Sequence, residues 1–187
     1  MQLSRLAIDD LVVIEPRRFG DDRGFFSEIF REEWFRREVA DVGLVQENHS
    51  LSRRAGTIRG LHFQAPDHPQ GKLVRVARGR IWDVAVDIRL GSPTFGQHCA
   101  IELSAENGLQ LWIPVGFAHG FCTLEPDCEV VYKVSDYYSA ANDRGLAFDD
   151  PALGIAWPCD LAGATLSEKD RRHRGLAELP DYFVHGG

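Results

Sequence analysis

The sequence predicts an all-β protein, an antiparallel sandwich or barrel with a few short helices at its periphery. Alternating apolar and polar residues, typical of half-buried strands, recur along the chain, for example at 84–88 and 130–134. Glycine, proline, asparagine and aspartate separate these segments at short intervals, as turns between antiparallel strands require. Helical periodicity is confined to short stretches, so strands make up most of the predicted fold.

Length and composition favour one domain over residues 1–187. The formal net charge of −7 argues against non-specific nucleic-acid binding, although a local basic cluster can still bind a phosphorylated small molecule. No apolar run approaches membrane-spanning length, and the first residues lack the layout of a signal peptide. The four cysteines have no CxxC spacing, which favours buried free thiols in a reducing compartment. We therefore expect a cytoplasmic protein without nucleic-acid or membrane partners.

The N-terminal quarter is predicted to contain a strand, a turn and a helix. The apolar run before Pro16 is a strand that the proline ends. The glycine-containing segment 19–26 is a turn with Arg23 exposed in it, and surface charge is the usual role of such an arginine. Residues 32–43 form a short helix that Gly43 closes.

Polar side chains then enter predicted strands in phase with their neighbours. Gln46 and Asn48 are two residues apart, so both amides face the same side and form a polar strip. Lys72 is in phase with Val74 and Val76, which places an ammonium on an otherwise apolar face. A buried lysine is costly unless it is paired or functional, and the alternative is a rim lysine whose head group reaches water. The histidine and arginine nearby in the sequence favour a functional lysine.

These two residues belong to the run RGLHFQ. Strand alternation predicts Arg59 on one face with the apolar residues that follow, and His62 on the opposite face with Gln64. Taken alone, His62 is more often a hydrogen-bonded core histidine than a catalytic base. After a loop, residues 72–89 form a pair of long alternating strands.

The C-terminal half continues the strand pattern. A strand at 98–104 is joined to the next one by a hairpin turn at Asn107 and Gly108. Tyr132 lies on the apolar face of a later strand, where core packing is its usual role. A terminal helix or turn begins near Ser167, whose spacing to Asp170 is that of a capping box. Four aromatic residues are expected to fill or line the sandwich: Trp82, Trp112, Phe117 and Trp157.

Two blocks resemble the paired motifs of the cupin jelly roll. The second block matches G-x5-P-x-G-x2-H at Gly108, Pro114, Gly116 and His119. The first matches G-x5-H at Gly56 and His62, but Gln64 stands where a metal cupin has its second histidine, and the acid expected a few residues later is missing. A first-row metal in such a barrel needs three or four histidine or carboxylate ligands. The sequence therefore predicts a jelly roll without a metal cofactor.

Several long blocks, spread over nearly the whole chain, resemble the dTDP-4-dehydrorhamnose 3,5-epimerases. They are FGDDRGFFSE (19–28), QENHSLS (46–52), TIRGLHFQ (57–64), QGKLVRVARG (70–79), DVAVDIRLGSPTFG (83–96), WIPVGFAHGF (112–121), VVYKVSDYY (130–138), DDPALGIAWP (149–158) and LSEKD (166–170). The resemblance implies a jelly-roll homodimer, an isomerase that epimerises dTDP-4-dehydro-6-deoxy-D-glucose at C3 and C5 in dTDP-L-rhamnose biosynthesis. It also implies that the enzyme needs neither a metal nor a redox cofactor.

The resemblance further implies residue roles. His62 is the general base with Asp170 as its orienting carboxylate, Tyr132 is the general acid, and Lys72 lies beside the C4 oxygen. The substrate-binding residues it implies are Arg23 and Arg59 for the diphosphate, Glu28, Gln46, Asn48 and Tyr138 for the nucleoside, and His119 as a lining residue. Asp143 departs from the family, which usually has a glutamate at that position, so no contact is carried over to it.

The chemistry suits these residue types. Proton removal at C3 or C5 puts negative charge on the C4 oxygen, so epimerisation needs a base, an acid on the opposite face of the sugar, and a cation for the enolate. Histidine titrates near working pH, the tyrosine phenol stays protonated, and a lysine supplies the positive charge. Three alternatives stay open: a single-centre epimerase or ketoisomerase, a non-catalytic nucleotide-sugar-binding module, and a metal-dependent cupin oxygenase that Gln64 disfavours.

Overall fold

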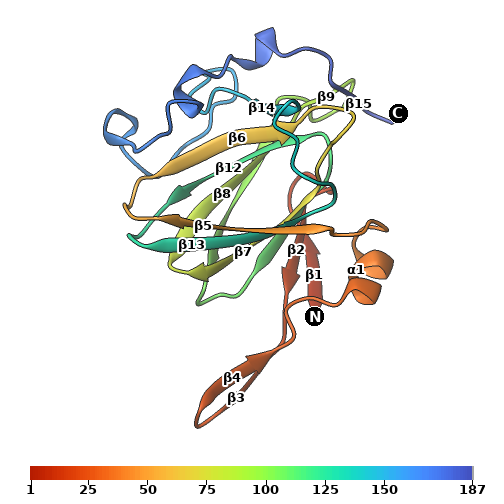
Figure 1. Ribbon diagram of the computed structural model, residues 1–187, viewed down its shortest axis with the longest axis vertical. Coiled ribbons are helices and arrows are strands. Elements are labelled where there is room, and N and C mark those ends of the chain that lie inside the picture. The colour runs from red at the N-terminus through yellow and green to blue at the C-terminus, as the bar shows by residue number, and fades with distance from the viewer. Residues whose placement is uncertain (187) are drawn as a thin grey trace.

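Two antiparallel sheets pack against each other in the computed structural model, which describes residues 1–186 (Figure 1). The larger sheet has the order β1 (Gln2–Arg5), β2 (Val12–Glu15), β11 (Gln110–Ile113), β7 (Lys72–Arg78), β13 (Cys128–Val134) and β5 (Gln46–Ser52). The smaller has the order β10 (His98–Ser104), β8 (Arg80–Asp87), β12 (Phe117–Thr123), β6 (Ile58–Gln64) and β14 (Asp143–Gly145). The predicted all-β jelly-roll class is confirmed.

Smaller elements surround the sandwich. A hairpin of β3 (Arg18–Asp21) and β4 (Gly24–Ser27) projects away from both sheets, and β9 (Arg89–Leu90) pairs in parallel with β15 (Phe183–Val184) (Figure 1). The helical elements are α1 (Glu32–Glu38) and the 3-10 turns η1 (Leu161–Gly163), η2 (Asp170–Arg172) and η3 (Leu176–Glu178). Among the residues described, no helix combines the length and the apolar character needed to cross a membrane.

Three apolar layers hold these elements together. Residues of both sheets, including Val74, Leu111 and Phe121, interdigitate in the central core. The outer face of the smaller sheet packs against the chain after β14, with Trp157 among the buried residues of that layer. Helix α1 closes the outer face of the larger sheet through Phe35, whose ring meets that of Trp112 edge to face at 5.1 Å. Each fully buried aliphatic side chain contributes about 1.5–3 kcal/mol to folding.

The predicted hairpin at Asn107 and Gly108 is wrong in its pairing. A turn is present, but β10 pairs with β8 in one sheet, while β11 pairs with β2 and β7 in the other. The Asn107 side chain accepts hydrogen bonds from the backbone N–H groups of Ser104 and Leu109, at 3.0 Å each. Because the side chain itself satisfies the turn, the flanking strands are free to enter different sheets.

The strands predicted at 72–89 also separate. Strand β7 lies in the larger sheet and β8 in the smaller one, so the chain crosses the core at Gly79 instead of forming a paired ribbon. The helix predicted at 32–43 is present but ends at Glu38, before Gly43. Three of the four aromatics expected in the sandwich are buried, and Trp82 is partly buried in the outer layer.

Candidate active site

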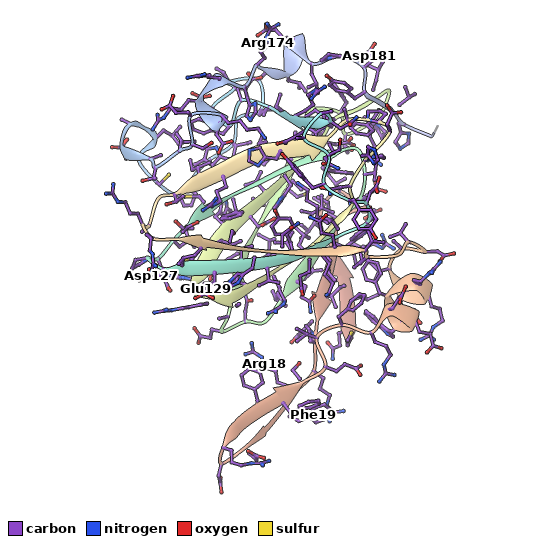
Figure 2. All side chains as sticks on the ribbon, viewed as in Figure 1. Arg18, Phe19, Asp127, Glu129, Arg174 and Asp181 are labelled. Atoms are coloured by element: carbon purple, nitrogen blue, oxygen red, sulfur yellow. The ribbon has the colours of Figure 1, made fainter. Side chains whose placement is uncertain are left out.

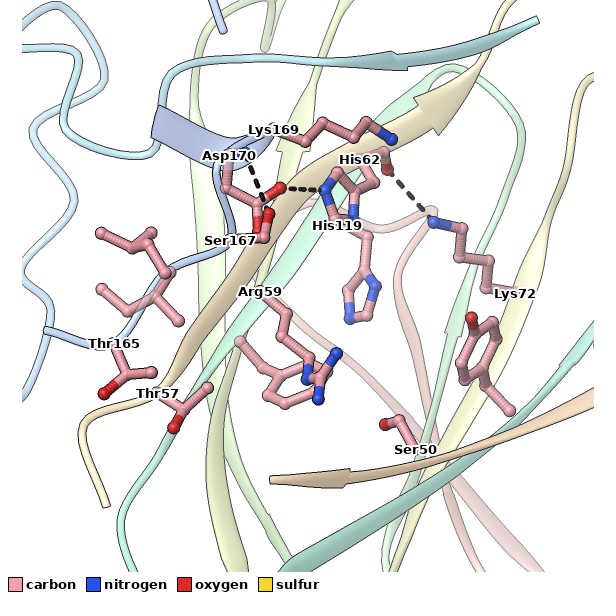
Figure 3. A pocket seen from close by; sticks show the side chains of 14 residues that line it. Ser50, Thr57, Arg59, His62, Lys72, His119, Thr165, Ser167, Lys169 and Asp170 are labelled. Atoms are coloured by element: carbon pink, nitrogen blue, oxygen red, sulfur yellow. Dashed lines mark hydrogen bonds and ion pairs between the residues drawn. The ribbon is translucent and has the colours of Figure 1, made fainter. Parts of the chain in front are cut away.

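A cavity of about 400 Å³ opens between the two sheets and is closed on one side by the C-terminal segment (Figure 3). It brings together six of the eleven predicted site residues: Arg59, His62, Lys72, His119, Tyr132 and Asp170. They come from β6, β7, β12, β13 and η2, so both sheets contribute. The combination of an imidazole, a phenol, an ammonium and a guanidinium in one cavity can move protons and bind an anion.

His62 forms a hydrogen-bonded pair with Asp170, with Nε2 and Oδ1 2.5 Å apart (Figure 3). The carboxylate arrives on η2 because the chain before it is fastened beside β6: Ile58 N–H donates to the carbonyl of Thr165 at 3.0 Å. The Asp170 backbone N–H also donates to Ser167 Oγ at 3.1 Å. The capping interaction and the contact with His62 therefore coexist, because the first uses the backbone of Asp170 and the second its side chain.

Electrostatics fix the charge states of this pair. Burial lowers the pKa of His62 below its ordinary value, and although Asp170 opposes the shift, the nearby Lys72 and Lys169 add to it. Burial alone would raise the pKa of Asp170, but His173 and His62 hold it well below the usual range of a carboxyl. At neutral pH the pair is thus a neutral imidazole and a carboxylate. Since a neutral imidazole has one N–H, donation from Nε2 leaves the lone pair on Nδ1.

Lys72 is buried and lies on the same strand face as Val74 and Val76, as alternation predicts. Its Nζ donates to the backbone carbonyl of His62 at 3.1 Å, which holds the ammonium beside the imidazole (Figure 3). Burial lowers the pKa of Lys72 to about 8, and the carboxylates of Asp143 and Asp83 limit the shift. Lys72 is only 8% exposed, so the alternative of a lysine at the rim with its head group in water is wrong.

Tyr132 enters the cavity from β13 in the larger sheet, whereas His62 enters from β6 in the smaller one. Burial raises the pKa of the Tyr132 phenol above its ordinary value, with Arg59 opposing the shift and Asp143 adding to it. The phenol therefore stays protonated at neutral pH. A proton acceptor and a proton donor thus stand on the two sheets that form the cavity walls.

Arg59 lines the same cavity as His62, which contradicts the simple alternation expected for RGLHFQ. The pairing between β6 and β12 shifts its register between His119 and Phe121, which adds the odd residue needed to bring both side chains to one face. Gly60 permits this, because it has φ +121° and a Cβ there would lie 2.6 Å from the Cα of Gly120. Within the cavity, Arg59 donates to Ser52 Oγ and to the carbonyl of Leu51, both at 3.0 Å.

His119 forms a second histidine–aspartate pair with Asp83, at 2.9 Å between Nε2 and Oδ2. His119 lies opposite His62 across the β6–β12 register, but its partner comes from the adjacent strand β8. Asp83 is fully buried, and its Oδ1 has no hydrogen-bond partner among the residues that the structure describes. Asp83 was not among the site residues predicted from the sequence, although strand alternation places it on the face opposite Val84 and Val86.

The polar strip predicted on β5 is present. Gln46 donates to Asn48 Oδ1 at 2.8 Å, and the Gln46 side-chain oxygen accepts the backbone N–H of Tyr138 at 3.0 Å. The Tyr138 hydroxyl donates to Asp143 at 3.1 Å, and Lys169 is paired with the same carboxylate. These residues form a connected polar group. Strand β5, which carries Gln46 and Asn48, also supplies Ser50 to the cavity.

Gln64, the residue at the missing metal-ligand position, is buried and fastens the loop that carries Tyr138. Its amide donates to the carbonyls of His68 and Tyr137 at 2.6 and 3.1 Å, and its oxygen accepts the backbone N–H of Ser139 at 2.6 Å. The glutamine therefore has a structural task in this fold, in which all its polar atoms are used.

Arg23 and Glu28 do not line the cavity. Arg23 is at the tip of the β3–β4 hairpin, 90% exposed and paired with Asp21, while Glu28 pairs with Arg31. Figure 2 shows Arg18 and Phe19 on the same hairpin, where Arg18 donates to the carbonyl of Ala105 in the turn between β10 and β11, at 2.6 Å. Within one chain, neither residue is placed at the cavity, where the family resemblance implies that Arg23 binds the diphosphate and Glu28 the nucleoside.

The fold and the cavity can be compared with known proteins. A family model described as dTDP-4-dehydrorhamnose 3,5-epimerase matches residues 5–178. The chain belongs to the dTDP-4-dehydrorhamnose 3,5-epimerase family. The family resemblance found in the sequence is thus confirmed. The chain is 58% identical over 185 residues to the dTDP-4-dehydrorhamnose 3,5-epimerase of Sinorhizobium fredii, covering 99% of this chain and 94% of the relative.

Two solved structures of epimerases are similar over most of their length. The dTDP-6-deoxy-D-glucose-3,5-epimerase of Legionella pneumophila, in complex with dTDP-4-keto-L-rhamnose, has a TM-score of 0.91 and 44% identity, covering 95% of this chain and 94% of that one. A 3′-monoepimerase from Streptomyces bikiniensis, in complex with dTDP-quinovose, has a TM-score of 0.84 and 35% identity, covering 92% and 87%. Both double and single epimerases therefore share this architecture.

Proposed function

We propose that this protein epimerises dTDP-4-dehydro-6-deoxy-D-glucose at C3 and C5, giving dTDP-4-dehydro-L-rhamnose as an isomerase of dTDP-L-rhamnose biosynthesis. One observation carries the proposal: a neutral imidazole and a protonated phenol enter one cavity from opposite sheets, with a buried ammonium beside the imidazole. Sugar inversion next to a ketone requires this arrangement, because the proton leaves from one face and returns to the other.

The residues divide the steps as follows. His62 Nδ1 removes the proton at C3 or C5, and Asp170 stabilises the imidazolium that forms. Lys72 donates to the C4 oxygen as the enolate develops; removing a donor of this kind costs about 2.7–4 kcal/mol of transition-state stabilisation. Tyr132 then protonates the carbon from the opposite face. General acid and base groups contribute about 10²–10⁴-fold each, so base, acid and enolate stabilisation are all needed.

The nucleotide end of the substrate has candidate partners at the cavity and around it. Arg59 presents a guanidinium that suits a diphosphate, and His119 lines the wall nearby. The polar group of Gln46, Asn48 and Tyr138 offers amides and an aromatic ring for the nucleoside.

A homodimer is part of the proposal. The projecting hairpin exposes Phe19, Phe25 and Phe26 at 52%, 61% and 71%, an apolar surface typical of an interface. Because Arg23 lies outside the cavity of its own chain, a diphosphate-binding role requires the cavity of a second copy. Mixing an Arg23→Ala chain with a His62→Asn chain should then restore activity that neither homodimer has. The free cysteines suit a cytoplasmic enzyme.

The test is NMR of the substrate with the protein in deuterated water, reading exchange at C3 and C5. Deuterium at both carbons, with formation of the L-rhamno product, is the expected result. Exchange at one carbon would indicate a single-centre epimerase, as in the Streptomyces bikiniensis relative. No exchange, with dTDP still bound, would favour a non-catalytic nucleotide-sugar-binding module. Tyr132→Phe should keep the exchange while suppressing inversion.

A further inference from the structure

A second histidine, His173, approaches Asp170 on the side away from the proposed chemistry. Its Nε2 lies 3.6 Å from Asp170 Oδ1, the same oxygen that accepts from His62 at 2.5 Å. The side chain of His173 is 12% exposed, and its Nε2 is buried without a hydrogen-bond partner among the described residues. A buried ring nitrogen whose only polar contact is this long one to a carboxylate has capacity left for a ligand.

We propose that His62, Asp170 and His173 form a binding site for a divalent first-row metal, with Zn²⁺ as the probe, and that metal binding there switches the enzyme off. The ligand atoms of the three residues lie within 4.8 Å of one another. Two imidazoles and one carboxylate, with water in the fourth position, make up a common open zinc site. The inhibitory effect, but not the binding, rests on the proposed function.

The three ligand atoms need to move only slightly to hold a zinc ion. Tetrahedral zinc at about 2.0–2.2 Å from each ligand places ligand atoms about 3.3 Å apart. Asp170 Oδ1 is 3.6 Å from His173 Nε2, which exceeds the ligand–ligand distance of a zinc site. It is 2.5 Å from His62 Nε2, so these two atoms must separate by less than about 1 Å. The ring of His173 has room because residue 145 is glycine: a Cβ there would lie 2.2 Å from His173 Nε2.

Cavities lie beside the three ligand residues, and His62 is the most exposed of the three. His62 is 32% exposed toward the cavity of about 400 Å³ that it lines with Asp170. His173 lines a different cavity, of about 330 Å³. Two ammonium groups, those of Lys72 and Lys169, oppose a dication here, but Asp143 pairs with Lys169. We therefore expect micromolar rather than nanomolar affinity.

Metal binding would remove the proposed base by changing its tautomer. In the free enzyme, Nε2 of His62 carries the hydrogen that Asp170 accepts, and Nδ1 holds the lone pair. A metal on Nε2 moves the hydrogen of a neutral imidazole to Nδ1. The nitrogen that faces the sugar then donates instead of accepting, so proton abstraction stops.

The test is calorimetric titration of Zn²⁺ into the chelator-treated full-length protein. The expected result is one Zn²⁺ per chain with a micromolar Kd, raised at least tenfold in His173→Gln. The matched control is His49→Gln, which removes a surface histidine from a similar pair with Glu129, at 3.0 Å, and should leave the Kd unchanged. If His173→Gln fails to fold, as judged by its thermal unfolding, His173→Asn takes its place.

Deuterium exchange into the substrate supplies the second readout. Zn²⁺ should inhibit exchange in the wild type at the concentrations that bind, with reversal by a chelator, and His173→Gln should need at least tenfold more Zn²⁺. Absence of Zn²⁺ binding, or equal affinity in wild type and His173→Gln, would overturn the metal site. Stoichiometric, His173-dependent binding in a protein that shows no exchange without metal would support the site and refute the proposed function.

Discussion

The cavity contains two histidine–aspartate pairs that differ in how they are built. His62 and His119 lie opposite each other on β6 and β12, and each contacts one carboxylate. Asp83 reaches His119 from the adjacent strand, whereas Asp170 reaches His62 from a 3-10 turn 108 residues away. The first histidine is 32% exposed to the cavity and the second only 8%.

This difference shows that a histidine–aspartate contact alone does not identify a base. Exposure to the cavity separates the two pairs, and Lys72 donates directly to the backbone of the exposed histidine, His62. The His62–Asp170 pair, built from distant segments, is open to the cavity, whereas the His119–Asp83 pair, built within one sheet, is buried. Burial favours structural support, and access favours chemistry.

The largest effect is expected from His62→Asn. Removal of the base should lower kcat by about 10³–10⁴-fold, at the upper end of what a general base contributes, with little change in dTDP affinity. Exchange at C3 and C5, read by NMR, is the measurement. His119→Asn is the comparison, and an equal loss in both variants would erase the distinction between the two pairs.

Lys72→Met should lower kcat by about 10²–10³-fold, because the ammonium that the enolate needs is gone while the stem still fills its apolar site. Steady-state kinetics with the dTDP-sugar measure this. A loss confined to KM would instead make Lys72 a binding residue.

Asp170→Asn should lower kcat by about 10²-fold. An asparagine can still accept from His62, but it stabilises the imidazolium poorly and can present its amide in the wrong orientation. Asp83→Asn should lower kcat less than Asp170→Asn does, because His119, the partner of Asp83, takes no part in the proposed proton transfer. A larger loss in Asp83→Asn than in Asp170→Asn would reverse the assignment of the pairs.

The pH profile of kcat/KM tests the charge states of His62 and Lys72. His62 must be neutral to act as a base, and its lowered pKa means that kcat/KM rises with pH along an acid limb whose midpoint lies below the ordinary histidine value of about 6.5. Lys72 must be charged, and its pKa of about 8 predicts a decline on the alkaline side. Lys72→Met should abolish that decline while keeping the acid limb. A profile that stays flat from pH 6 to 9 would contradict the assignment of Lys72, and an acid limb with its midpoint above about 6.5 would contradict that of His62.

The smallest effect on catalysis is expected from His119→Asn, which should lower kcat less than tenfold. Its main consequence is structural, because the fully buried Asp83 loses the partner of its Oδ2. A buried group left without its hydrogen bond costs about 1–3 kcal/mol. Chemical denaturation of the variant and the wild type at one pH measures the loss in the free energy of unfolding.

Residue order alone is enough to predict the strands and the side-chain directions that alternation controls. The all-β class, the position of Lys72 on an apolar face, and the shared side of Gln46 and Asn48 follow from a period of two residues, which is a local property of extended chain. The family resemblance also rests on local blocks, so it too needed no structure. Where strand geometry is regular, residue order is enough to say which way a side chain points.

Contacts between distant segments set the features that local periodicity cannot predict. Arg59 shares a face with His62 because of a register shift against a neighbouring strand, and the Asn107 turn connects two sheets because its side chain, not strand pairing, satisfies it. Asp170 and His173 meet His62 through the packing of the C-terminal segment along β6. These contacts join residues far apart in sequence, and their geometry is set by the packing of whole segments, which no window of sequence contains.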